Sequence, residues 1–216
     1  MKKVLTKLVP ALLLAMGAAS ASASVMTLGT IDKLYGSAAG RGATASTGAG
    51  SCDILNASSI TVKDTSSGCE RFHDTFNFSG LNYKSLDSLD LTLSFSNTDD
   101  TNTVLIFFKV KEDWRVKIAD TSSHSSSVLL DMTNSTATTT QVFHIDAASH
   151  PDVFANIATN GYFQLWFGDE AAGANNFQLS AASVKINGTP VPEPASLALF
   201  GAALLGGIAA RRRRPS

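Results

Sequence analysis

The sequence predicts an all-β protein, an antiparallel β-sandwich of jelly-roll-like type, flanked by an N-terminal signal peptide and a single C-terminal transmembrane helix. Three observations carry this prediction. Apolar and polar residues alternate with a period of two through the middle of the chain, polar stretches separate the alternating segments, and an apolar stretch lies near each end. Eight or more short strands with almost no helical periodicity are typical of such sandwiches.

The first 23 residues have the organisation of a signal peptide. Lys2, Lys3 and Lys7 give a positive start, an apolar stretch follows at 8–19, and Ala-Ser-Ala at 21–23 satisfies the small-x-small rule of signal peptidase. The apolar stretch is shorter than the ~20 residues of a membrane span. We therefore expect signal peptidase to cleave after residue 23 and the rest of the chain to be exported.

Residues 24–190, between that peptide and the C-terminal stretch, suit one domain. Residues 24–58 form a Gly/Ser/Ala-rich segment that is expected to hold the first strand, and residues 59–190 are predicted to form the sandwich. The span 24–190 holds ten basic and 17 acidic residues, a formal net charge of −7. Nucleic acid and anionic lipid both bind basic surfaces, so this charge argues against them as partners.

Cys52 and Cys69 are the two cysteines of the chain. Exported proteins fold in oxidising compartments, and no Cys-x-x-Cys spacing or flanking histidine indicates a metal or redox pair. A disulfide between them is therefore expected, which would stabilise the fold by about 3 kcal/mol.

The clearest strand lies within SLDLTLSFSNT, where Leu89, Leu91, Leu93 and Phe95 alternate with polar residues. We expect these four side chains to face the core and their polar neighbours to face water, as in antiparallel sheets with one wet side. A hairpin turn at NTDDTN should lead into TVLIFFKVKE, whose denser apolar run predicts a more central strand.

Other segments follow the same reasoning. Further strands are predicted at Ile60–Lys63, Arg71–Phe78, 113–120, Thr140–Ile145, Tyr162–Phe167 and Phe177–Ile186. The Ser/Thr-rich residues 121–140 should form a hydrated loop or an edge strand. One stretch, HPDVFANIATNG, predicts a helical turn that begins at Pro151 and ends at Asn160-Gly161.

Three aromatic residues, Trp114, Tyr162 and Trp166, are the candidates for a sugar-stacking platform on one face of the sandwich. If Phe163, Leu165 and Phe167 face inward, Tyr162, Gln164 and Trp166 face outward together. Aromatic residues in strands are more often part of the core. The outward alignment nevertheless keeps open a function as a module that binds carbohydrate, such as exopolysaccharide.

The sequence gives little sign of catalysis. Its four histidines show no metal-binding spacing and no Gly-x-Ser-x-Gly motif is present, so we expect no enzymatic activity, no cofactor and no catalytic metal. A secreted hydrolase is the least favoured alternative. The acidic stretches 97–102 and 168–176 each offer oxygen ligands that a structural Ca²⁺ would accept.

The last 26 residues read VPEPASLALFGAALLGGIAARRRRPS. The two prolines around Glu193 deny helix, so this stretch should be extended and accessible to another protein. Residues 195–210 would span about 24 Å as a helix, and arginines that snorkel to the surface can lengthen the span. By the positive-inside rule the arginines stay in the cytoplasm, which leaves residues 24–190 outside.

This order of parts resembles the PEP-CTERM sorting domain of exported bacterial proteins. The residues that carry the resemblance are the motif Val191, Pro192, Glu193 and Pro194, the apolar helix, and the membrane stop Arg211, Arg212, Arg213 and Arg214. Proteins with this domain look like substrates of exosortase, a membrane-embedded Cys-type protease or transpeptidase. The resemblance implies a non-enzymatic protein that is held in the membrane by its C-terminal helix, processed by an exosortase-type enzyme, and then located at the cell surface or in the extracellular matrix.

Overall fold

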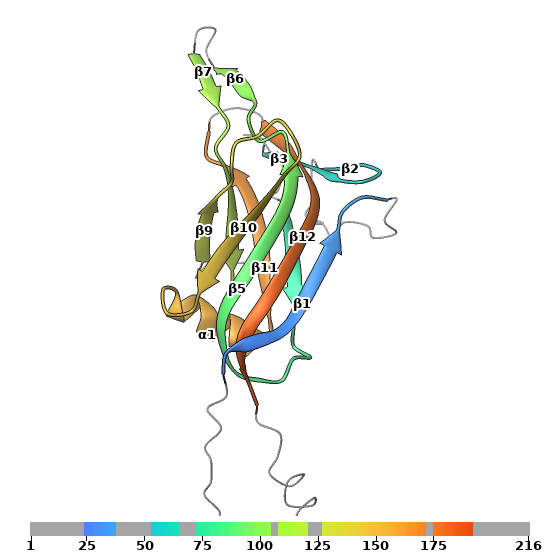
Figure 1. The fold of residues 1–216 in the computed structure, drawn as a ribbon. Coiled ribbons are helices and arrows are strands. Elements are labelled where there is room, and N and C mark those ends of the chain that lie inside the picture. The colour runs from blue at the N-terminus through green and yellow to red at the C-terminus, as the bar shows by residue number, and fades with distance from the viewer. Residues whose placement is uncertain are drawn as a thin grey trace, which may run out of the picture.

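Two antiparallel sheets with a common hydrophobic core form the body of the protein (Figure 1). The computed structural model describes residues 24–37, 53–64, 72–104, 108–120, 127–171 and 175–191. Its elements are β1 (Met26–Leu34), β2 (Ile54–Leu55), β3 (Ile60–Asp64), β4 (His73–Asn77), β5 (Tyr83–Ser96), β6 (Thr101–Val104), β7 (Phe108–Lys111), β8 (Trp114–Ala119), β9 (Ser127–Asp131), β10 (Thr139–Asp146), α1 (Pro151–Asn160), β11 (Tyr162–Asp169) and β12 (Asn175–Pro190).

The first sheet, which we call sheet A, has the order β10-β5-β12-β3-β2, with β1 also paired to β12. The two partners share one side of β12, because β3 pairs with its residues 175–179 and β1 with its residues 181–188. The second sheet, sheet B, has the order β4-β11-β8-β9. All of these ladders are antiparallel, which confirms the predicted all-β class.

The eight main strands pair in a nested order, as in a jelly roll. The outermost pair in sequence is β3 with β12, followed inward by β4 with β11, β5 with β10, and β8 with β9. Successive pairs belong alternately to sheet A and to sheet B. This alternation is the arrangement that two Greek keys give in a jelly roll. Strands that are distant in sequence therefore become neighbours.

The core lies between the two sheets and is built by the alternation in the sequence. Leu89, Leu91 and Leu93 are 0% exposed and Phe95 is 1% exposed, as predicted for one face of β5. Opposite them, Phe163, Leu165 and Phe167 of β11 point inward from sheet B. Aromatic contacts join the sheets: the ring of Phe177 on β12 lies 5.5 Å from that of Phe167 on β11.

The prediction of a central strand at 103–112 is wrong. The structure has instead two short strands, β6 and β7, which pair only with each other among the described residues. This hairpin projects from the end of the sandwich opposite the chain ends (Figure 1). Its Phe108 side chain is 67% exposed, so this aromatic residue is not part of the core.

The Ser/Thr-rich stretch 121–140 contains an edge strand, one of the two forms predicted for it. Its described part includes β9, which pairs on one side with β8 and ends sheet B. Val128 is buried and Leu129 is 46% exposed, so one face of this strand covers the core and the other faces outward.

Helix α1 is the one helix among the described residues and follows the predicted stretch. Pro151 is its first residue, and the chain leaves it at Gly161 with a left-handed φ of 70°, where the Gly161 N–H donates to the Ile157 carbonyl. Val153, Phe154 and Ile157 are buried, so the helix covers one end of the core.

Both ends of the described chain lie at the same end of the sandwich (Figure 1). Met26 at the start of β1 pairs with Gly188 near the end of β12, and β12 ends at Pro190. We call this end the base. The predicted signal peptide, residues 1–23, precedes the base in the chain, and residues 192–216 follow it, both outside the described residues.

Candidate functional site

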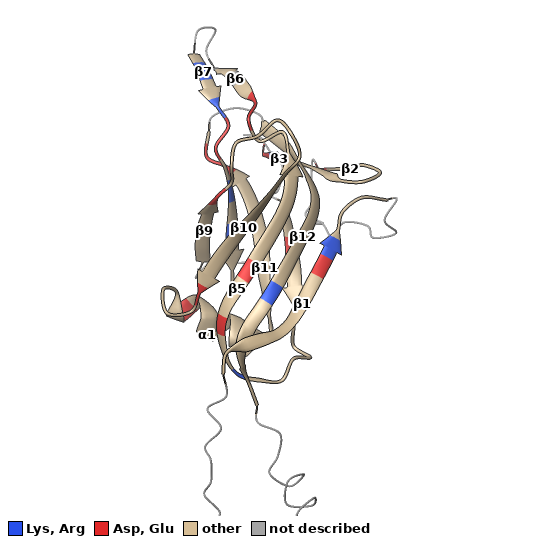
Figure 2. Ribbon diagram, in the orientation of Figure 1, with Lys and Arg blue, Asp and Glu red and all other residues tan. Residues whose placement is uncertain are grey.

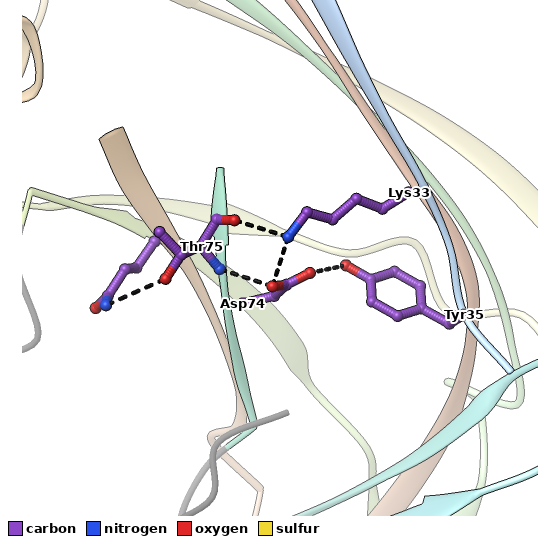
Figure 3. Close-up of polar contacts among 5 residues, drawn as sticks. Lys33, Tyr35, Asp74 and Thr75 are labelled. Atoms are coloured by element: carbon purple, nitrogen blue, oxygen red, sulfur yellow. Dashed lines mark hydrogen bonds and ion pairs between the residues drawn. The ribbon is translucent and has the colours of Figure 1, made fainter. Parts of the chain in front are cut away.

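A buried carboxylate joins β1 of sheet A to β4 of sheet B (Figure 3). Asp74 is 1% exposed, and its Oδ1 accepts from Lys33 Nζ at 2.6 Å while its Oδ2 accepts from the Tyr35 hydroxyl at 2.8 Å. Lys33 Nζ also donates to the Thr75 carbonyl at 2.7 Å. We call Lys33, Tyr35 and Asp74 the Asp74 cluster. It holds the two sheets together along one edge of the sandwich.

The environment of the cluster is largely apolar. The Lys33 ammonium lies 4.6 Å from the centre of the Phe76 ring, and the Tyr35 ring packs edge-on against Phe72 at 6.0 Å. Burial, and after it the negative charge of Asp74, raises the pKa of the Tyr35 hydroxyl well above its usual value, so Tyr35 acts as a hydrogen-bond donor. A charge that points inward from an edge strand also discourages pairing with other chains.

Replacing Asp74 with alanine should destabilise the fold by about 2–3 kcal/mol. The Lys33 charge would lose its partner. Breaking a fully buried ion pair lowers the free energy of unfolding by ~3–5 kcal/mol, and the loss here is smaller because the Lys33 side chain is 22% exposed. Urea unfolding of the exported chain, followed by tryptophan fluorescence, measures the loss. In the matched double variant Lys33→Met/Asp74→Leu no charge is left unpaired, so part of the stability should return. An unchanged midpoint for Asp74→Ala would contradict this role.

The proposed aromatic platform is only partly formed. Trp114 is 0% exposed and packs in the core 4.6 Å from the Phe177 ring, so its inclusion in a surface platform is wrong. Its side chain shares the inward face of β8 with Val116 and Ile118. Tyr162 and Trp166 are partly exposed and alternate with the buried residues of β11, which places both on the outer face of sheet B.

Contacts from a neighbouring strand fix the orientation of Trp166. Its ring stacks on His73 of β4, with centroids 4.1 Å apart and an interplanar angle of 17°. Its Nε1 donates to Gln164 Oε1 at 3.2 Å, and Gln164 Nε2 donates in turn to Thr75 Oγ1 at 3.4 Å. Thr75 follows Asp74 on β4, so the buried cluster and the outer face are connected through one strand.

A shallow hollow opens beside Trp166 on the outer face of sheet B. Its volume is about 30 Å³, and it is lined by Arg115, Lys117, Leu129, Trp166, Phe167, Gly168 and Glu170. Gly168 sits in the middle of this set on β11 and pairs with Arg115 of β8. Gly168 is itself buried, so neighbouring side chains cover the backbone at this position.

The hollow combines charged and apolar walls. Arg115 is held by Asp113 at 3.0 Å and by Asp131 at 3.1 Å, and Lys117 has no ion-pair partner within the described ranges. Trp166 and Leu129 provide apolar surface next to these cations. Sequence reasoning found Trp166 by its alternation on β11, but β8 and β9 contribute their side chains through pairings that local pattern does not reveal.

The two acidic stretches proposed for calcium come close to each other through Glu112 and Asp113. Glu112 Oε2 accepts from the Asp100 N–H at 3.3 Å, and Asp169 Oδ1 accepts from the Asp113 N–H at 2.8 Å. Burial raises the pKa of both Glu112 and Asp169. The part of the chain that the structure describes nevertheless contains no group of three or more His, Cys, Asp or Glu side chains that could hold a metal ion.

The sorting residues begin where sheet A ends. Pro190 pairs with Tyr83 of β5, and the following Val191 is 53% exposed. Pro192, Glu193 and Pro194, the predicted helix and the arginines 211–214 lie outside the described residues, as do Cys52 and Cys69, so the structure does not test these predictions. No helix among the residues that are described is long and apolar enough to cross a membrane.

Comparison with known families identifies the C-terminal region. Residues 190–214 match the family model of the PEP-CTERM protein-sorting motif. The chain therefore carries a PEP-CTERM sorting motif, which confirms the resemblance found in its order of parts. The motif indicates an exported protein that is handled at the membrane through an exosortase-targeted signal. No curated protein matches the chain.

Proposed function

We propose that this chain is a non-enzymatic protein of the bacterial cell surface or extracellular matrix, which an exosortase-type enzyme sorts and processes at its C-terminus. Signal peptidase removes residues 1–23, residues 195–210 hold the chain in the inner membrane, and cleavage near Pro-Glu-Pro releases the folded body. The match of residues 190–214 to the sorting motif is the observation that carries the proposal.

The geometry of the base supports this order of events. β12, the last of the described strands, ends at Pro190. Four residues, 191–194, separate Pro190 from the predicted membrane segment, and a chain of four residues reaches at most ~14 Å. The folded body would therefore stand close to the membrane on its base, and cleavage after Pro190 would leave every described strand intact.

The surface of the body suits a protein with a hydrated, structural role. The outward side chains of sheet A are mostly short and polar, for example Thr92 and Ser94 on β5 and Ser183 on β12. Charges of both signs are scattered along β1, β5 and β12 (Figure 2). Short polar side chains and scattered charges keep exposed sheet surfaces soluble and disfavour association of sheet edges.

The proposal is tested by following the body through fractionated cells with an antibody raised against it. Wild-type cells should show a membrane-bound precursor that is converted to a smaller form outside the inner membrane. Cells that lack the exosortase-type enzyme should accumulate only the precursor. If the chain leaves the membrane at the same size and in the same amount without that enzyme, the proposed processing is wrong.

A further inference from the structure

The Asp74 cluster brings an amine and a carboxyl group into contact between the two sheets (Figure 3). Lys33 lies on β1 and is partly buried, and the Asp74 side chain on β4 is 0% exposed. Lys33 Nζ is 2.6 Å from Asp74 Oδ1, and the Tyr35 hydroxyl donates to Oδ2 at 2.8 Å. An amine held against a carboxyl group in this way places the two reactants of an amide bond side by side.

We propose that Lys33 and Asp74 condense to an intramolecular amide bond, which joins β1 of sheet A covalently to β4 of sheet B. Nζ first transfers a proton to Oδ1, which converts the ion pair into a neutral amine and a carboxylic acid. The amine then attacks Cγ of Asp74, so that a bond forms between Nζ and Cγ and the bond from Cγ to Oδ1 breaks. Oδ1 leaves as water with the two protons that Nζ gives up, and the reaction is complete without a further reactant. The cross-link goes beyond the sorting function and does not depend on it.

The fold supplies the main requirements of this reaction. In dilute solution an amine and a carboxylate meet rarely, whereas well-oriented groups in one molecule react as though each were present at roughly 10⁵–10⁸ M. The surroundings of the pair are apolar, since the Phe76 ring lies 4.6 Å from Lys33 Nζ and the Phe72 ring packs against Tyr35. Apolar surroundings disfavour the charged forms of both groups, and the reaction requires the neutral forms.

The hydrogen bonds around the pair suit the individual steps. Negative charge develops on Oδ2 when the amine attacks Cγ, and the Tyr35 hydroxyl already donates to this oxygen. Burial, and after it the charge of Asp74, raises the pKa of that hydroxyl, so it keeps its proton. The Thr75 N–H donates to the departing Oδ1 at 2.8 Å, and the Thr75 carbonyl accepts from Nζ at 2.7 Å and positions the amine. Because the Lys33 side chain is 22% exposed, the water that forms can escape.

The cross-link adds to the stability that the ion pair gives. It closes a loop between positions 33 and 74 and therefore restricts the unfolded chain, as a disulfide does. The urea midpoint of the wild type should lie above that of a variant that keeps the charges but cannot form the amide. The loss caused by Asp74→Ala should likewise exceed the loss expected for the ion pair alone.

Mass spectrometry of the exported chain, reduced, alkylated and digested with trypsin, tests the proposal directly. Trypsin cleaves after Lys and Arg but not after a lysine whose amine is part of an amide. We therefore expect the peptide that ends at Arg41 to contain Lys33 uncleaved and to be linked to the peptide 72–84. The mass of the linked pair should be the sum of the two peptides minus one water molecule.

Lys33→Arg is the matched control, because a guanidinium keeps the positive charge beside Asp74 but does not attack a carboxyl group. This variant should release the peptide 72–84 in free form. Tyr35→Phe removes the donor to Oδ2 and should slow the appearance of the linked pair roughly a hundredfold after synthesis, as measured on the protease-resistant chain.

The wild-type digest alone decides the question, so the test remains valid if a variant fails to fold. The proposal is overturned if the wild type releases free peptide 72–84 as fully as Lys33→Arg does, because the cluster is then an ion pair only. A linked pair of the same two peptides in Lys33→Arg would also overturn it, since the bond would then join other residues.

Discussion

Replacing Leu91 with aspartate should prevent the body from folding. Leu91 is 0% exposed on β5, where it pairs with Phe143 of β10 and Val184 of β12. Truncating such a leucine costs about 2–5 kcal/mol, and burial of an unpaired carboxylate adds several more. Since domains of this size are stable by about 5–15 kcal/mol in total, little or no folded protein should remain.

Thr92→Asp is the matched control for this change. Thr92 is the next residue on the same strand and its side chain points to the outer face of sheet A, where water solvates a carboxylate. The measurement is the yield of exported, protease-resistant chain, with circular dichroism on the purified product. We expect almost no resistant Leu91→Asp chain and a near wild-type amount of Thr92→Asp. Equal resistance of the two variants would contradict the assignment of the faces of β5.

The alternation in the sequence predicted the inward faces of the central strands because each residue is placed by its neighbours two positions away. Leu89 to Phe95 on β5 and Phe163 to Phe167 on β11 follow this rule. The same rule places Trp114 on the inward face of β8 with Val116 and Ile118. This placement contradicts the prediction that Trp114 belongs to a surface platform.

The error at 103–112 has a different cause. Strand β6 ends at Val104 and β7 begins at Phe108, and the residues between them are Leu-Ile-Phe. Gly, Pro, Asn and Asp, which usually mark the end of a strand in a sequence, do not occur among these three residues. An apolar run without a turn residue looks like one continuous buried strand, and only the pairing of Thr101 with Lys111 reveals two.

The Asp74 cluster and the hollow were beyond local reasoning because each is assembled from distant parts of the chain. Asp74 meets Lys33 across 41 positions, and this contact requires that the edges of two different sheets meet. Likewise, Trp166 faces Lys117 only because β11 pairs with β8. The nested pairing of the strands creates both sites, and it follows from the whole topology rather than from any single segment.

The sequence alone identifies the sorting motif because its parts are contiguous. The chemistry of Pro-Glu-Pro also leads to a prediction. Glu193→Ala should leave the chain at full length in the inner membrane. The substitution leaves the apolar stretch 195–210 and the arginines 211–214 untouched, so a plain anchor would insert as before. A processing enzyme would instead lose the one charged side chain that stands between two rigid prolines.

An immunoblot of fractionated cells, with an antibody against the body, separates these two cases. We expect the wild type to yield a smaller form outside the inner membrane and Glu193→Ala to yield only full-length chain in the membrane fraction. Ser196→Ala, three residues further on, is the matched control and should be processed normally because Pro-Glu-Pro is intact. The last described strand ends at Pro190, before either substituted residue, and we expect neither substitution to alter the stability of the body. If Glu193→Ala gives the same sizes in the same fractions as the wild type, no processing enzyme recognises the glutamate and the C-terminal segment acts only as a membrane anchor.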